Sequence, residues 1–570
     1  MNLCDSRRLT GPNLLLDGPG AILDVSLGNE DSVKVVKLWR GQARRILDAV
    51  GWGGETTHAR TFPGGASLAI SASFDTLYAA TELNEWAWAA TEAVLKGDAE
   101  PEVADGAARL ADLIASERKP RLVAMRDAAS RHKVGFVWDD RLVTVGLGQG
   151  SRTWPIEELP DPGDVGWDRV HDVPLVLVTG TNGKTTTVRL LAAILTASGR
   201  VPGVSSTDGV FVGSEKVEAG DYSGPEGARA VLRNERVEAA VLETARGGIL
   251  RRGLTLPQAD AAIVTNVAAD HLGEFGILDL DSLLAVKMVV AKVVKSEGRL
   301  VLNADDPVIL ARADPRRVPV TWITIDPGNR DVHAHLGAGG DACWVEAGAF
   351  VRSHRARRET VLPVAEAPVT LGGAARHNVS NALGAIALAT ALGLPAESVA
   401  AGLRAFRGTP AENPGRCNVF DLAGVRVLLD FAHNPHGLAA LVETGSALPA
   451  RRRLIVLGQA GDRDDESIRE LTRVAWGARP DRILIKEMRH LLRGRVEGAI
   501  PAIIEEELRR LGAPAEIVER ADSDLDAARL ALRWSRSGDL LLLPIHSDRG
   551  AVTTLLQRLQ ERGWIPGTPL

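Results

Sequence analysis

Residues 180–186 constrain the fold of this chain more than any other segment. They follow the apolar run 175–178, which predicts a buried strand, and they precede a helix-compatible stretch, 188–197. A glycine-rich turn between a strand and a helix N-terminus directs backbone N–H groups at anionic oxygens. Lys184 can then reach the β- and γ-phosphates, and the Thr185 hydroxyl can hold Mg²⁺. The sequence therefore predicts an α/β domain that binds a nucleoside triphosphate.

The loop is shorter than the full Walker pattern, because Val178 stands where that pattern has its first glycine. A purely structural turn between strand and helix is the alternative interpretation. The Lys-Thr-Thr run at the start of the helix favours phosphate binding, since a structural turn does not require these side chains. The predicted nucleotide-binding residues of the loop are Gly180, Thr181, Asn182, Gly183, Lys184, Thr185 and Thr186.

Length and composition bound the class of protein. A chain of 570 residues predicts about three or four domains. With 45% hydrophobic residues, 25% charged residues and a net charge of -6, it has an ordinary soluble composition and no electrostatic signal for nucleic acid or an anionic membrane. Its three cysteines are far apart, and no apolar run approaches the roughly 20 residues of a membrane span. We therefore predict a cytoplasmic protein without a nucleic acid or membrane partner.

The order of apolar and helical segments divides the chain. Residues 1–165 mix strand-like and helix-like segments and end in a proline-rich stretch that is typical of a linker. Residues 166–410 alternate apolar runs with helical stretches, which predicts a mostly parallel sheet wrapped by helices. A second series of this kind occupies residues 411–570. The predicted fold is α/β, with an N-terminal α/β module, a central phosphate-loop domain and a Rossmann-like C-terminal domain.

Two side chains near strand ends are candidates for a metal site. Glu243 ends the apolar run 240–242, and His271 follows another such run. In open α/β sheets, ligand-binding and catalytic residues lie at the carboxyl ends of the strands. We therefore expect Glu243 and His271 to reach Mg²⁺ at the phosphate loop. The alternative interpretation of Glu243 is a solvated glutamate at a strand end. That of His271 is a surface or core histidine with a purely structural role.

Taken together, these motifs resemble the Mur ligase superfamily and, within it, the cyanophycin synthetase family. The resemblance extends over the central and C-terminal parts of the chain. The segments that carry it are residues 180–186, 206–209, 220–225, 242–251, 265–267, 270–273, 302–307, 377–378 with 381, 414–416, 430–435, 461–463, 486–487 and 493–495.

The resemblance implies ATP-dependent amide ligation through an acyl-phosphate, with release of ADP. It implies catalytic roles for Lys184, Lys287, His271 and Arg416. Mg²⁺, in two sites, would be held by Thr185, Glu243, His271 and Lys287, the last as a carbamylated lysine that supplies anionic oxygens. An exposed helix lysine is the alternative interpretation of Lys287.

Further nucleotide contacts follow from the same resemblance. Asn378 would hydrogen-bond the adenine, Arg416 would contact the γ-phosphate, and Asp430 would face the ribose and phosphates. The alternatives are a buried asparagine that caps its helix and an Arg416–Asp430 pair across a hinge.

The N-terminal module also resembles the opening domain of the cyanophycin synthetase family, through residues 9–13 and 141–148. That family carries an ATP-grasp domain between this part and the Mur-like half, whereas only residues 154–174 separate them here. The chain is therefore expected to make one kind of bond, between an amino acid such as arginine or lysine and an acidic, aspartate-like peptide or polymer.

Three alternatives to this activity stay open. The chain could act on an unrelated acid, such as a γ-glutamyl acceptor or a peptidyl metabolite. It could be a non-catalytic partner of an ATP-grasp-containing synthetase. Formation of a homo-oligomer is compatible with each of these activities. A kinase or simple NTPase is also compatible with the phosphate loop by itself.

Overall fold

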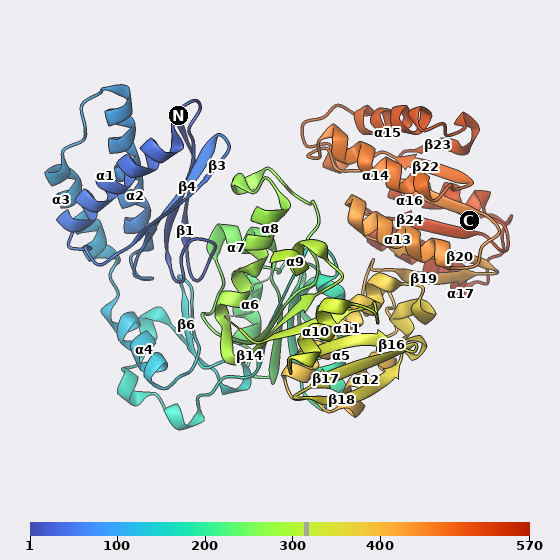
Figure 1. Ribbon diagram of the computed structural model, residues 1–570, viewed down its shortest axis with the longest axis horizontal. Helices are drawn as coiled ribbons and strands as arrows, with labels where there is room; N and C mark the ends of the chain where they lie inside the picture. Colours follow the sequence, from blue (N-terminus) through green and yellow to red (C-terminus); the bar gives the residue numbers. More distant parts are fainter. Residues whose placement is uncertain (313–317) are drawn as a thin grey trace.

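The computed structural model describes residues 1–312 and 318–570, which form an N-terminal, a central and a C-terminal α/β unit. In Figure 1 the N-terminal unit (blue) and the C-terminal unit (orange to red) lie on opposite sides, and the central unit (green to yellow) lies between and below them. Within the described residues, no helix combines the length and apolar character needed to cross a bilayer.

The N-terminal unit contains an antiparallel sheet with helices packed on one face. Across the sheet the strands are β1 (Asn2–Leu9), β2 (Gly20–Ser26), β4 (Gly65–Ser71) and β3 (Thr57–Phe62). The helices are α1 (Ser32–Ala49), α2 (Leu77–Lys96) and α3 (Val103–Glu117). Alternating apolar residues of β2 and β4 meet Trp39, Trp86 and Trp88 in this core.

A small antiparallel sheet connects this unit to the rest of the chain. It consists of β5 (Phe136–Trp138), β6 (Leu142–Val145) and β7 (Arg152–Pro155), and α4 (Pro120–Arg131) packs against it. Between β7 and the next strand the chain makes only short 3-10 turns, over the segment that the sequence predicts to be a linker. Proline rings there restrict φ and remove N–H donors, so this stretch does not extend a helix or join a sheet.

The central unit is built on one large sheet that is parallel in the middle and antiparallel at both edges. In order across the sheet, its strands are β11 (Glu215–Glu218), β10 (Gly209–Val212), β9 (Pro202–Ser206), β12 (Ala239–Glu243), β8 (Leu175–Thr179), β13 (Ala259–Val264), β14 (Val294–Asn303), β15 (Val320–Thr324), β16 (Asp341–Glu346), β17 (Ala349–His354) and β18 (Arg357–Pro363). The predicted mostly parallel sheet is confirmed.

Helices cover both faces of the central sheet, as the nearly continuous apolar strands require. On one face pack α5 (Lys184–Ala197), α11 (Arg376–Ala391) and α12 (Ala396–Ala405). On the other face pack α6 (Pro225–Leu232), α7 (Arg246–Arg252), α8 (Leu280–Lys287), α9 (Pro307–Arg312) and α10 (Arg330–Gly337). Helix α5 begins earlier than the apolar periodicity predicts, because Gly183 ends the preceding loop in a left-handed conformation directly before Lys184.

The C-terminal unit repeats this plan, with one antiparallel edge strand. Its strand order is β19 (Asn418–Leu422), β20 (Val425–Asp430), β24 (Leu540–Pro544), β21 (Arg453–Leu457), β22 (Arg482–Lys486) and β23 (Val518–Ala521). One face carries α13 (Pro435–Ala447), α14 (Asp465–Gly477) and α15 (Ala499–Arg510), and the other carries α16 (Asp524–Trp534) and α17 (Arg549–Glu561). The Rossmann-like C-terminal fold is confirmed.

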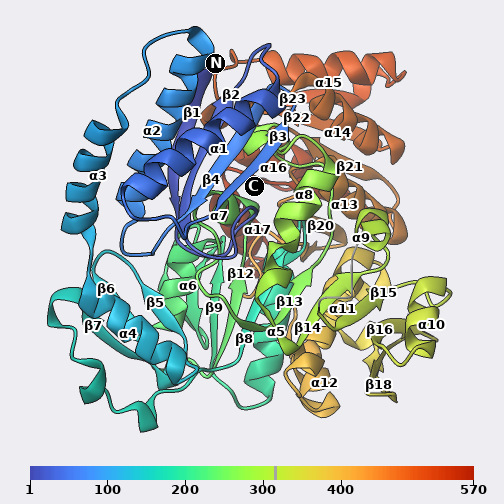
Figure 2. The same cartoon turned by 60° about the vertical axis from the view of Figure 1, so that its left-hand side comes forward.

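Figure 2 gives a second view of the whole molecule, with α3 at the left and α14 and α15 at the upper right.

Three neighbouring strands of the central sheet end beside the phosphate loop. Strand β8 lies between β12 and β13, and Val178 is paired with Glu243 while Thr179 is paired with Val264. The carboxyl ends of parallel strands meet at one edge of a sheet. The segments after β8, β12 and β13 therefore form one surface, which faces the C-terminal unit.

Candidate active site

The phosphate loop depends on two glycines. Gly180 has φ +150° and Gly183 has φ +83°. A Cβ at Gly180 would lie 1.8 Å from Thr265 Oγ1, and a Cβ at Gly183 would lie 2.2 Å from Asn381 Oδ1. Asn381 is buried and donates to Asn378 Oδ1 at 3.1 Å, so it is not free to move away. The loop therefore tolerates no side chain at either position.

Replacing Gly183 with alanine should destabilise the protein and weaken ADP binding. Gly199 has the same φ of +83°, but a Cβ there would meet nothing within 4 Å, so Gly199→Ala is a matched control. Both changes should cost about 1 kcal/mol for the left-handed backbone, and the clash at Gly183 should add about 2 kcal/mol. Urea unfolding and ADP titration measure both effects. Equal losses in the two variants would contradict the steric argument.

The segment after β13 holds the loop in place. The backbone N–H of Thr181 donates to Asn266 O at 2.9 Å, and that of Asn182 donates to Asn266 Oδ1 at 2.9 Å. Thr265 Oγ1 donates to Asn182 O at 2.7 Å. Lys184 turns its amine back toward the loop, where it donates to Thr181 O at 2.9 Å. A phosphate bound in the loop would replace these carbonyls as the partner of the amine.

Thr185 and Glu243 form the pair expected at a Mg²⁺ site. Thr185 Oγ1 donates to Glu243 Oε2 at 2.8 Å, and Glu243 is buried. Glu243 Oε1 is also buried and has no hydrogen-bond partner among the described residues. Burial raises the pKa of Glu243, against the opposing charges of Lys184 and Arg416 and the bond from Thr185. A hydroxyl beside a carboxylate with an unused buried oxygen fits a hard divalent cation, so this glutamate is not a solvated strand end.

His271 lies at the same edge of the sheet but has other neighbours. Its Nδ1 is 3.6 Å from Glu274 Oε1, and its Nε2 is 3.2 Å from a guanidinium nitrogen of Arg463. Burial lowers the pKa of His271. Across residues 1–312 and 318–570, no three His, Cys, Asp or Glu side chains are grouped as a metal site would require. A metal role for His271 together with Glu243 stays a prediction.

Lys287 is buried at the end of α8, so it is not an exposed helix lysine. Its amine makes no hydrogen bond or ion pair with any described residue. Burial, reinforced by the positive charge of Lys184, lowers the pKa of Lys287 well below the ordinary value for lysine. A lowered pKa favours the neutral amine, which is the form that reacts with CO₂ to give a carbamate.

Asn378 lies in the first turn of α11 and is buried. Its Nδ2 donates to Val369 O at 3.0 Å, and its Oδ1 accepts from Asn381. Both ends of the amide therefore have partners within the protein, and no helix-capping bond is formed by this side chain. Its contact with adenine stays a prediction.

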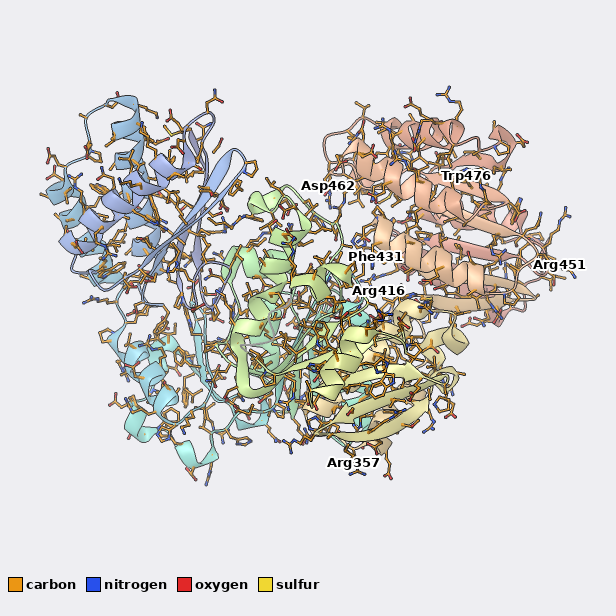
Figure 3. The ribbon with its side chains drawn as sticks, viewed as in Figure 1. Arg357, Arg416, Phe431, Arg451, Asp462 and Trp476 are labelled. Carbon is orange, nitrogen blue, oxygen red and sulfur yellow. The ribbon has the colours of Figure 1, made fainter. Side chains whose placement is uncertain are left out.

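Arg416 lies beside Phe431, where the chain passes from the central to the C-terminal unit (Figure 3), and Asp430 is the last residue of β20. The Arg416 guanidinium stacks over the Phe431 ring at 4.8 Å and makes no ion pair with any described residue. Asp430 Oδ2 accepts from the backbone N–H of Cys417 at 2.7 Å, and burial raises the pKa of Asp430. The two side chains do not form a direct salt bridge across the hinge. Arg416 keeps its donors for another partner.

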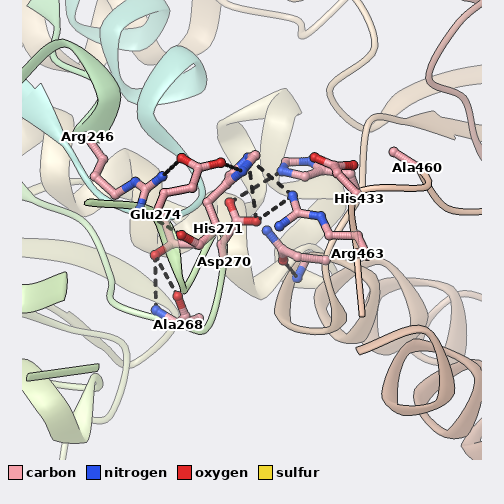
Figure 4. Close-up of polar contacts among 12 residues, drawn as sticks. Arg246, Ala268, Asp270, His271, Glu274, His433, Ala460 and Arg463 are labelled. Atoms are coloured by element: carbon pink, nitrogen blue, oxygen red, sulfur yellow. Dashed lines mark hydrogen bonds and ion pairs between the residues drawn. The ribbon is translucent and has the colours of Figure 1, made fainter. Parts of the chain in front are cut away.

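An ion cluster joins the central and C-terminal units (Figure 4). A guanidinium nitrogen of Arg463 lies 2.9 Å from Asp270 Oδ1, and His433 Nε2 lies 3.6 Å from Asp270 Oδ2. Burial would raise the pKa of Asp270, but contact with His433 and the charges of His271 and Arg463 lower it. The sequence contains Asp270 and Arg463 within recognisable motifs, but it does not indicate that they meet, because they lie on different units.

Two further contacts close the same interface. The side-chain amides of Asn182 and Asn434 pair with each other at 3.2 Å in both directions. Arg549, at the start of α17, donates to Asp208 Oδ1 at 2.9 Å and to Pro414 O at 3.2 Å. No local motif singles out Arg549, so sequence reasoning missed it. The C-terminal unit is therefore docked over the phosphate loop.

Comparison with known proteins places this site in a family. Residues 178–389 match the Mur ligase middle domain, and residues 415–544 match the Mur ligase, glutamate ligase domain. A cyanophycin synthetase of Crocosphaera subtropica is 43% identical over 316 residues, which are 55% of this chain and 36% of that protein. A UDP-N-acetylmuramoyl-L-alanyl-D-glutamate--2,6-diaminopimelate ligase of Gloeobacter violaceus is 30% identical over 304 residues, 52% of this chain and 58% of that protein.

A solved structure of E. coli FolC in complex with ADP covers 68% of this chain and 90% of its own, with 22% identity and a TM-score of 0.49. The present chain spans only about a third of the cyanophycin synthetase that it matches, 36% of its length. The two matched domains contain the phosphate loop, the Thr185–Glu243 pair and the docked C-terminal sheet. Through its central and C-terminal units, the chain belongs to the Mur ligase family.

Proposed function

We propose that this protein is an ATP-dependent, ADP-forming ligase that joins a carboxylate to an amine. The observation that carries the proposal is the convergence of Lys184, the Thr185–Glu243 pair and Arg416 from two docked units. Arg416 lies close enough to Glu243 to act on its pKa, although the two belong to different units. Cationic side chains that approach from both units can neutralise the negative charge on a phosphoryl group during its transfer.

The chemistry takes two steps. An oxygen of the acceptor carboxylate attacks the γ-phosphorus of ATP, the bond to the β-γ bridging oxygen breaks, and ADP leaves. The amine nitrogen then attacks the acyl carbon, loses a proton, and displaces inorganic phosphate. Lys184 would neutralise the phosphate oxygens and Arg416 would orient the γ-phosphate, so that binding and positioning lower the barrier. Mg²⁺ held by Thr185 and Glu243 would supply further charge neutralisation.

Lys287 would extend this site as a carbamate. Its neutral amine form adds to CO₂ and releases one proton, which gives a buried anionic oxygen ligand. The burial and lowered pKa of Lys287 support this role. The predicted second Mg²⁺ site, with His271 as a further ligand, belongs to the same proposal.

The proposed substrates are an acidic, aspartate-like peptide or polymer and an amino acid such as arginine or lysine. Support comes from the 43% identity to a protein named cyanophycin synthetase. The remaining nucleotide contacts that we propose are Asn378 with adenine and Asp430 with the ribose and phosphates. A homo-oligomer, or a complex with an ATP-grasp-containing synthetase, is compatible with this function.

The test is amine-dependent release of phosphate from ATP in the presence of Mg²⁺. Arginine, lysine and other amino acids are paired with aspartate-containing peptides, β-aspartyl-arginine material, γ-glutamyl acids and free diacids, and products are identified by mass spectrometry. We expect a product heavier by one amino acid less water, formed with one phosphate per bond. Tight ATP binding without turnover of any pair would contradict an autonomous ligase and indicate a partner-dependent subunit.

A further inference from the structure

The segment that carries Asp270 and His271 has an unusual backbone. It leads from the end of β13 to α8 and includes a 3-10 turn, Glu274–Gly276. Left-handed φ angles occur at His271 (52°) and Phe275 (54°), as well as at Gly273 and Gly276. A left-handed residue with a side chain costs on the order of 1 kcal/mol, so such a conformation persists only when the surroundings enforce it.

The N-terminal unit supplies one part of this enforcement. Arg60, on β3, donates from one guanidinium nitrogen to Phe275 O at 2.6 Å and from another to Gly276 O at 2.8 Å. Phe62, on the same strand, fills the space beside Gly276, where a Cβ would lie 2.4 Å from its ring. Two carbonyls of the turn thus accept from one planar, fork-shaped guanidinium, which restricts both the position and the orientation of the turn.

Arg7, on β1, holds the same turn through its side chain. Its guanidinium lies over the Phe275 ring at 4.7 Å, and its Nε donates to Leu250 O of α7 at 3.0 Å. Arg7 is itself buried and pairs with Asp24 of β2 at 2.6 Å. The N-terminal sheet is therefore a rigid support for the turn and for the helix next to it.

The opposite end of the segment contacts helix α7 and the C-terminal unit. The backbone carbonyl of His271 accepts from Arg246 at 2.7 Å, while Asp270 pairs with Arg463 of the C-terminal unit at 2.9 Å (Figure 4). The segment 270–277 therefore touches the N-terminal unit at one end and the C-terminal unit at the other.

We propose that Arg60 is a positioning residue for the active site, through which the N-terminal unit sets the place of His271 and Asp270. This inference rests on the proposed function, because it assigns His271 to Mg²⁺ and Asp270 to docking of the C-terminal unit. Loss of the Arg60 fork frees the turn, displaces His271, and weakens Mg²⁺ binding without touching the phosphate loop. The N-terminal unit then helps to position residues of the ligase active site.

The test compares Arg60→Ala with Arg44→Ala in the full chain. Arg44 is a matched control, since its guanidinium also donates to two backbone carbonyls, Gly53 O and Glu55 O, both at 2.8 Å, but within the N-terminal unit. Hydrogen–deuterium exchange of residues 268–278 reports on the turn and needs no turnover. The Mg²⁺ concentration required for half-maximal binding of a non-hydrolysable ATP analogue reports on the metal site.

We expect Arg60→Ala to increase exchange in residues 270–277 and to raise the Mg²⁺ requirement about tenfold, as loss of a residue that orients a ligand does. Arg60→Lys keeps the charge but not the fork, so an intermediate effect should follow. Unchanged exchange in Arg60→Ala, or equal changes in Arg44→Ala, would overturn the proposal. Altered exchange and Mg²⁺ requirement without ligation of any substrate pair would uphold the positioning role and reject the proposed activity.

Discussion

Lys184→Ala is expected to abolish ATP-dependent ligation, with kcat/KM lowered about a thousandfold or more. The amine of Lys184 lies against the loop carbonyls at 2.9 and 3.2 Å, where a bound phosphate would meet it. Alanine removes the charge that neutralises the phosphate oxygens, and nothing else in the loop supplies one. Phosphate release and product mass in the panel assay measure the effect.

The control for this change is Lys216→Ala, on the exposed strand β11. It removes the same charge from the same unit and should leave turnover within about twofold, since exposed charges interact weakly. Retention of substantial ligation by Lys184→Ala would contradict the assignment of residues 180–186 as the phosphate-binding loop.

Lys287→Ala is expected to lower ligation about a hundredfold and to leave ADP affinity nearly unchanged. The physical reason is that Lys287 is buried and has no polar partner among the described residues, so its removal breaks no hydrogen bond or ion pair but eliminates the site of carbamate formation. A lost metal-positioning group typically reduces activity by one to two orders of magnitude, or about 10- to 100-fold. Phosphate release and isothermal ADP titration separate the two effects.

Lys292→Ala serves as the control, because Lys292 follows closely in the chain but pairs with Asp17 at 2.9 Å on the surface. It should retain activity. Wild-type activity should also fall when bicarbonate and CO₂ are removed and recover when they return, whereas that of Lys287→Ala should not respond. Full ligation by Lys287→Ala would reject the carbamate.

Local patterns in the sequence were sufficient for the fold and for the centre of the site. The apolar runs at residues 175–178, 239–242 and 261–264 predict strands, and the structure contains β8, β12 and β13 at these places. Parallel pairing then brings Glu243 beside the phosphate loop, where it accepts from Thr185. Such predictions succeed because a strand period and a loop motif are set by neighbours in the chain.

Local patterns in the sequence did not reveal that the Lys287 side chain is buried and that its pKa is lowered. A lysine on a short helix is ordinarily exposed, and only the packing of α8 onto the central sheet buries it. The same holds for His271, whose nearest polar partners include Arg463 from another unit. Burial and pKa depend on atoms far away in sequence, so no local window contains them.

The sequence by itself determined the phosphate loop, the mostly parallel sheets and the membership of a ligase family, since each depends on residue order over short segments. Only the tertiary structure decided which charges meet across units: Asp270 with Arg463, Asp208 with Arg549, and Arg60 with the turn at Phe275. These pairs join residues more than a hundred positions apart, and their contacts exist because independent sheets dock with complementary surfaces. Folding of the whole chain brings the two residues of each pair together, and the sequence around one residue does not specify which residue it will contact.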